Sequence, residues 1–132
     1  MIKDPVFELC DIVREVSFEL HCYLKHGHLE KVYENGLANR LQQRGISFER
    51  QVPLVVRDKD GTVLGEYYAD LVIGGLLIVE IKACRALTND HTAQLIGYLR
   101  ATGYEHGLLI NFGSSRFEIK KYALSSAMVT NP

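Results

Sequence analysis

Three charged residues stand at spacings that suit metal-assisted chemistry. Asp70 ends the polar part of the segment GEYYADLVI, and Glu80 and Lys82 follow in the apolar segment LLIVEIKA. Such an apolar run indicates a buried strand, where an unpaired ion costs several kcal/mol. Alternation along a strand places Glu80 and Lys82 on one face and Ile81 on the other. The two charges therefore need partners close by.

The loop after Ile73 decides whether the two acids can meet. With a two-residue Gly-Gly loop, they would point to opposite faces of the hairpin. With a three-residue loop over 74–76, Ile73 pairs with Leu77 and Asp70 stands directly opposite Glu80. The Cβ atoms of directly opposed residues lie about 4.5–5.5 Å apart. We therefore predict the longer loop or a distorted strand, because only these allow a shared site.

Two carboxylates at this separation can hold one divalent cation. Asp70 and Glu80, with the backbone carbonyl of Ile81, would provide the oxygen ligands that hard cations such as Mg²⁺ or Mn²⁺ prefer. Lys82 could orient a water molecule or neutralise a phosphate, and Arg85 could hold a phosphate. The pattern Asp-x9-Glu-x-Lys therefore suits metal-dependent hydrolysis of phosphodiesters. The alternative is a solvated face, because Glu-x-Lys triplets are common on exposed strands.

Bulk properties exclude several classes of protein. The chain has 132 residues, 47% hydrophobic and 23% charged, which predicts one domain over residues 1–132 with a normal core. Its net charge of −1 means that nucleic acid would have to bind a local patch, to which residues such as Arg50 could contribute. We expect neither a membrane span nor a secretory signal. The three cysteines are odd in number and form no C-x-x-C pair, which argues against a disulfide framework or a zinc ribbon and suits the reducing cytoplasm.

Periodicity and turn residues predict eight elements. Helices are expected over about 5–25, 29–44 and 88–103, and strands over 47–58, 62–73, 76–83, 106–112 and 116–124. A strand, a helix and a further strand imply one parallel pair, preceded by antiparallel hairpins. We predict an α/β fold, a three-layer sandwich with a mixed central sheet, and a loose tail over 125–132.

Several motifs in one order resemble a known superfamily. Asp70, Glu80-x-Lys82 and Gln94-x-x-x-Tyr98 resemble the PD-(D/E)XK nucleases and their RecB-like branch. More closely, GHLEKVY, YADLVI, IVEIKA, HTAQLIGYLRATG and GLLINFG are similar to the bacterial GxxExxY protein family. The resemblance runs from about Phe7 to Tyr122. It departs from the superfamily pattern at Ala69, where a proline is usual.

The resemblance implies a fold, an activity and a set of site residues. The fold would contain the restriction-endonuclease-like αβββαβ core, and the activity would be a Mg²⁺-dependent endo- or exonuclease, a hydrolase acting on DNA. DNA repair, recombination and defence are the candidate settings. Asp70 and Glu80 would bind metal, Lys82 and the helical acid Glu30 would complete the catalytic set, and Gln94 and Tyr98 would contact the site or the nucleic acid.

Other interpretations of these residues stay open. Glu30 would otherwise be an acid favoured at a helix N-terminus, and Gln94 with Tyr98 would be one half-buried helix face. A nuclease-fold module without turnover, binding nucleic acid or protein, is the alternative function. A carboxylate-pair glycosidase would leave Lys82 without a task. Affinity from so small a domain is limited, so a homodimer or a partner protein would help to extend the surface.

Overall fold

A computed structural model describes residues 4–124 of the chain. The elements are α1 (Pro5–Leu24), α2 (Glu30–Gln43), β1 (Phe48–Arg57), β2 (Val63–Ile73), β3 (Leu77–Lys82), α3 (Asn89–Thr102), β4 (His106–Asn111) and β5 (Glu118–Ala123). The predicted order is confirmed, with boundaries that differ by a few residues. The tail expected over 125–132 lies outside the described residues.

Local sequence signals begin and end the helices. The Asp4 side chain accepts a hydrogen bond of 2.9 Å from the Val6 amide, and Pro5 occupies the first helical position. Thr88 caps α3, whose C-terminal cap is Gly103 in the left-handed conformation. No helix within 4–124 is long and apolar enough to cross a membrane.

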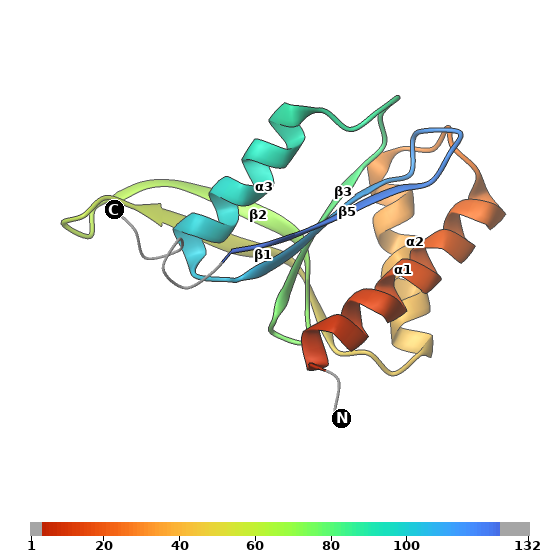
Figure 1. Cartoon of the computed structure of the whole chain (residues 1–132), viewed down its shortest axis with the longest axis horizontal. Helices are drawn as coiled ribbons and strands as arrows, with labels where there is room; N and C mark the ends of the chain where they lie inside the picture. Colours follow the sequence, from red (N-terminus) through yellow and green to blue (C-terminus); the bar gives the residue numbers. More distant parts are fainter. Residues whose placement is uncertain (1–3, 125–132) are drawn as a thin grey trace.

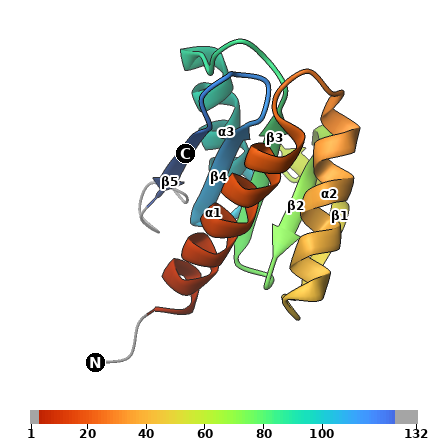
Figure 2. The ribbon, with the colours of Figure 1, turned by 90° about the vertical axis from the view of Figure 1, so that its right-hand side faces the viewer.

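The sheet has five strands in the order β1-β2-β3-β4-β5. Strands β3 and β4 pair in parallel and are connected through α3, whereas the other neighbours are antiparallel. Helices α1 and α2 cover one face of the sheet and α3 the other, as Figures 1 and 2 show. The predicted α/β sandwich with a mixed sheet is therefore confirmed.

Two apolar clusters hold the three layers together. The larger one joins α1 and α2 to the sheet through residues such as Leu37, Leu71 and Ile110. The smaller one lies under α3 and includes Leu54, Ala69 and Leu99. The fold therefore has a core on each face of the sheet, and both cores reach β2.

Strand β2 pairs with β3 only on the C-terminal side of Asp70, and the two strands separate at that residue. Ile73 pairs with Leu77, which confirms the predicted three-residue loop, and the recorded pairing ends at Leu71 with Val79. Beyond that point β1 and β2 continue as a two-stranded arm that lies under α3 in Figure 1. Asp70 therefore stands where the sheet opens.

Strand β1 is distorted at the same level. Gln51 has a φ of 49°, and the pairing of β1 with β2 skips Gln51 and Asp70. Side chains change faces here, because Ala69 packs under α3 whereas Leu71 packs under α1 and α2. A left-handed residue inside a strand costs about 1–3 kcal/mol and tends to mark a functional region.

Candidate active site

The carboxylate of Asp70 takes the place of the missing strand pairing. Its Oδ2 accepts a hydrogen bond of 2.7 Å from the backbone N–H of Ile81. The carbonyl of Lys82 accepts from the amide of Phe112, the residue that follows β4, so alternation directs the Ile81 carbonyl to the opposite edge, towards β2. The side chain of Asp70 and the backbone of Ile81 thus face each other across the opening.

Glu80 lies beside Asp70 and is almost completely buried. Its side chain points to the α3 face, 6% of the residue is exposed, and Oε1 has no hydrogen-bond partner among the described residues. Burial, followed by the neighbouring Asp70 carboxylate, raises the pKa of Glu80 to about 8. An ionised Glu80 therefore requires a positive partner that residues 4–124 supply only in part, through Lys82.

Helix α3 supplies a second wall of polar side chains. Lys82 Nζ donates a hydrogen bond of 3.3 Å to Oε1 of Gln94. One helical turn further on, Tyr98 is buried, and burial, Glu80, Tyr67 and Asp70 together raise its pKa to about 12. Its hydroxyl therefore stays protonated in the neutral range and can act as a hydrogen-bond donor.

Glu30 approaches the acids from the other helical layer, at the start of α2. Although the residue is exposed, partial burial of its carboxyl raises the pKa of Glu30, and the Asp70 carboxylate adds to the effect while Lys82 opposes it. The structure therefore brings Glu30 near Asp70 and Lys82. Arg85 is exposed on the loop after β3, where no hydrogen bond or ion pair joins it to another described residue.

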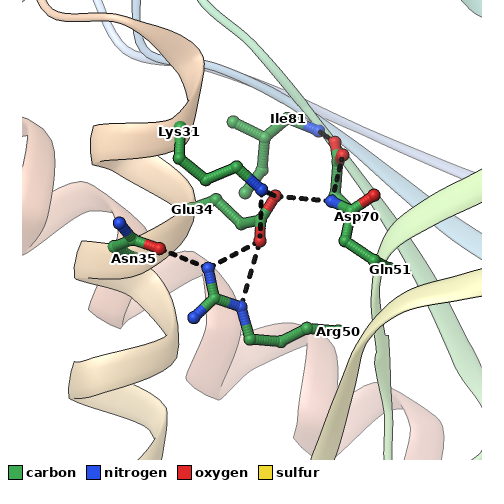
Figure 3. Close-up of polar contacts among 7 residues, drawn as sticks. All are labelled: Lys31, Glu34, Asn35, Arg50, Gln51, Asp70 and Ile81. Carbon is green, nitrogen blue, oxygen red and sulfur yellow. Dashed lines mark hydrogen bonds and ion pairs between the residues drawn. The ribbon is translucent and has the colours of Figure 1, made fainter.

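An ion pair between buried Glu34 and exposed Arg50, which the sequence interpretation missed, lies on the α2 side of Asp70 (Figure 3). Glu34 is 3% exposed and accepts hydrogen bonds from Arg50, Lys31 and Gln51. Burial alone would raise the pKa of Glu34, but the hydrogen bonds from Arg50 and Lys31 lower it. This carboxylate is therefore held in its ionised form.

Gln51 connects this ion pair to the candidate site. Its Nε2 donates to Oε1 of Glu34 at 2.7 Å and to Oδ1 of Asp70 at 3.3 Å. Both oxygens of Asp70 are thus engaged, one by Gln51 and the other by the Ile81 amide. The left-handed conformation of Gln51 accompanies this double contact.

One sequence signal for Glu34 was present. It lies on the same stripe of α2 as Leu37, Ala38 and Leu41, all of which are buried. An acid within an apolar stripe at helical spacing indicates a buried charge that must have a partner. Arg50, which the sequence suggested as part of a basic patch for nucleic acid, is that partner, and it also contacts Asn35.

The site fits a divalent cation held by two carboxylates. Among residues 4–124 no group of three or more His, Cys, Asp or Glu side chains is arranged to hold a metal ion. Asp70 and Glu80 nevertheless converge, Glu80 has an unpartnered buried oxygen, and the Ile81 carbonyl faces the same opening. Mg²⁺ commonly takes one or two protein carboxylates and keeps several waters, so this donor set fits it.

Comparison with known proteins identifies the family. The family model described as the PD-(D/E)XK nuclease superfamily matches residues 7–122. The chain belongs to the PD-(D/E)XK nuclease superfamily. The comparison with curated proteins finds no match.

Two solved structures align with the chain. The crystal structure of SSO0001 aligns with a TM-score of 0.56 and 23% identity, covering 75% of this chain and 52% of that protein. The chain therefore spans about half the length of SSO0001, and the likeness concerns the fold alone. An alkaline exonuclease (LHK-Exo) from Laribacter hongkongensis aligns with a TM-score of 0.45 and 10% identity, covering 98% of this chain and 75% of the exonuclease.

Proposed function

We propose that this chain is a metal-dependent nuclease that hydrolyses phosphodiester bonds in DNA. The observation that carries the proposal is the convergence of Asp70 and Glu80 at the opening of the sheet, with Lys82 beside them, in a member of a nuclease superfamily. The motifs GHLEKVY and Gln94-x-x-x-Tyr98 support assignment to the GxxExxY family and the RecB-like branch. Location of the protein in the cytoplasm remains a prediction from the sequence.

Each side chain has a distinct part in the proposed chemistry. Asp70, Glu80 and the Ile81 carbonyl would hold Mg²⁺ or Mn²⁺. When bound, such an ion supplies an activated water and stabilises negative charge on the phosphate. Lys82 Nζ, now bonded to Gln94, would donate to the water or to a phosphate oxygen.

The remaining polar residues would bind or orient the substrate. The protonated hydroxyl of Tyr98 would donate a hydrogen bond to the nucleic acid, and Gln94 would hold Lys82 in place. Arg85, exposed beside the site, would pair with a phosphate. Glu30 would orient the water from the α2 side.

Cleavage assays test this function directly. Purified protein with Mg²⁺ or Mn²⁺ should cut at least one of linear, nicked, branched or single-stranded DNA. Glu80→Ala and Lys82→Ala should abolish cutting, whereas Glu49→Ala, which removes an exposed acid from β1, should not. If wild type, Glu80→Ala and Lys82→Ala behave alike on all four substrates, the enzymatic proposal fails.

A binding module without turnover is the second candidate function. The observation that favours it is the raised pKa of Glu80, which keeps that acid protonated at neutral pH unless a cation is bound. Titration with Mn²⁺ by calorimetry separates the two functions. A working site binds the ion in the low-millimolar range or more tightly, and loses this binding in Glu80→Ala.

A further inference from the structure

A cavity lies between α3 and the β1–β2 arm, next to the carboxylate pair. Its volume is about 290 Å³, and its lining residues are Val56, Tyr67, Gln94, Gly97, Tyr98 and Ala101. Gln94 marks the end nearest the acids, because its Oε1 accepts a hydrogen bond from Lys82. From Gln94 to Ala101 the helix rises by about 10 Å, so the cavity extends roughly that far along the helix from the site.

Aromatic rings form two of its walls. The ring centroids of Tyr67 and Tyr98 are 5.0 Å apart, with the rings tilted by 42°. Tyr98 is buried and close enough to Glu80 for that acid to raise its pKa, whereas Tyr67 is 47% exposed. Tyr67 is thus a large aromatic surface kept in partial contact with water beside a proposed hydrolytic site.

A missing side chain contributes to the space. Gly97 is an exposed residue inside α3, and apart from the backbone of its own helix and its chain neighbours no described heavy atom comes within 4 Å of the position that its Cβ would occupy. Glycine is unfavourable inside a helix by about 1 kcal/mol relative to alanine. Neither backbone conformation nor packing explains it here, whereas a ligand in the cavity would use the open space.

The lining residues indicate what kind of chemical group the cavity would bind. All six lining residues are uncharged, and two present aromatic rings. A flat, neutral, aromatic group suits such walls, and stacking of a base on an aromatic side chain is worth about 1–3 kcal/mol. A phosphate would gain no positive partner from these residues, but it would gain one from Lys82 at the adjoining end.

From these observations we infer that the cavity binds one unstacked nucleobase of a single-stranded nucleic acid, next to the phosphate held at the carboxylate pair. This inference rests on the proposed nuclease function and specifies its substrate class. A base inside a duplex is stacked on its neighbours and is not free to enter. The protein therefore prefers single strands, or ends whose last bases have separated.

Binding of a fluorescent base tests the inference without cleavage. The probe is a single-stranded deoxyoligonucleotide that contains one 2-aminopurine, titrated with protein in Ca²⁺. Wild type should bind and quench the fluorescence. Tyr67→Leu should weaken binding about 5- to 150-fold, the range that corresponds to the loss of one stacked base. Tyr68→Leu is the matched control, because Tyr68 is a similarly exposed neighbour whose hydroxyl bonds to Glu66.

Gly97→Leu distinguishes an occupied cavity from a structural effect. The new side chain fills the cavity and should weaken single-strand binding by a similar factor. The Tm should stay equal or rise, because leucine favours a helix more than glycine does. Binding of a fully paired duplex should stay unchanged in this variant.

Several results would overturn the inference. These are a wild type that neither binds nor quenches the probe, full binding by Tyr67→Leu or Gly97→Leu, and equal weakening by Tyr68→Leu. Because no cleavage is measured, a protein that cuts no DNA but behaves as expected here would refute only the nuclease proposal. Conversely, cleavage with unchanged binding in Gly97→Leu would refute only the base-binding cavity.

Discussion

Replacing Glu80 by glutamine should stabilise the protein in a strongly pH-dependent way. The pKa of Glu80 is raised from 4.5 to about 8 by burial and by Asp70, so the native state holds a proton that the unfolded chain releases. Stability is therefore full below about pH 4.5 and is lost as the pH rises towards 8. Glutamine resembles the protonated acid in shape and cannot ionise, so Glu80→Gln removes this loss.

The size of the effect follows from the shift. With about 1.36 kcal/mol per pKa unit, ionisation of Glu80 in the unfolded chain removes roughly 2.5 kcal/mol of stability between about pH 5 and pH 7. For a chain of this length, that corresponds to roughly 8–12 °C in Tm. The difference in Tm between Glu80→Gln and wild type should thus be small near pH 5 and large at pH 7 and above.

Thermal unfolding in buffers free of divalent cations, followed by circular dichroism, measures this difference. Glu49→Gln is the matched control, because Glu49 is exposed on β1, and its Tm difference from wild type should be flat with pH. Mn²⁺ at about pH 8 should raise the Tm of wild type but not that of Glu80→Gln. A pH-independent difference between Glu80→Gln and wild type would refute the buried-carboxylate reasoning.

Four further variants probe the surroundings of the site. Gln51→Gly should leave the Tm near that of wild type, because relief of the left-handed conformation offsets the lost hydrogen bonds. Calorimetry should nevertheless find Mn²⁺ binding 10- to 100-fold weaker, as is typical when a residue supporting a metal ligand is lost. Gly113→Ala should lower the free energy of unfolding by at least about 2 kcal/mol, because its Cβ would lie 2.2 Å from a backbone atom of the loop after β3. Gly97→Ala should instead raise the free energy of unfolding, because the space around its Cβ is open. Tyr33→Phe should cost about 1 kcal/mol in urea unfolding, because the hydroxyl donates a hydrogen bond of 2.6 Å to the Lys25 carbonyl; a loss of activity without that cost would contradict a structural role.

Local sequence signals were sufficient to predict the elements and the meeting of the acids. Proline, threonine and glycine at helix ends fix the boundaries of α1 and α3 through contacts with near neighbours in the sequence. A longer loop after Ile73 or a distorted strand was predicted because only these allow Asp70 and Glu80 to share a site, and the pairing of Ile73 with Leu77 shows the three-residue loop. These features depend on residues a few positions apart.

The support of Asp70 could not be predicted in the same way. Gln51 takes up a left-handed conformation and joins Glu34 in α2 to Asp70 in β2, so its role depends on how three elements pack. Arg50 was considered a candidate for a nucleic-acid-binding patch because an arginine in isolation gives no sign of a buried partner. Propensity and periodicity describe one segment at a time, whereas these contacts arise only once segments have docked.

The narrow junction between β2 and β3 has a mechanical consequence. Three recorded residue pairs, from Leu71 with Val79 to Ile73 with Leu77, and the hydrogen bond from the Ile81 amide to Asp70 join β2 to β3. The packing of Leu54 and Ala69 under α3 and the hydrogen bond from the Ile81 amide to Asp70 hold the arm at a set angle to β3. We therefore expect an ion shared by Asp70 and Glu80 to reinforce the angle of the arm as well as to fix the charge of the site.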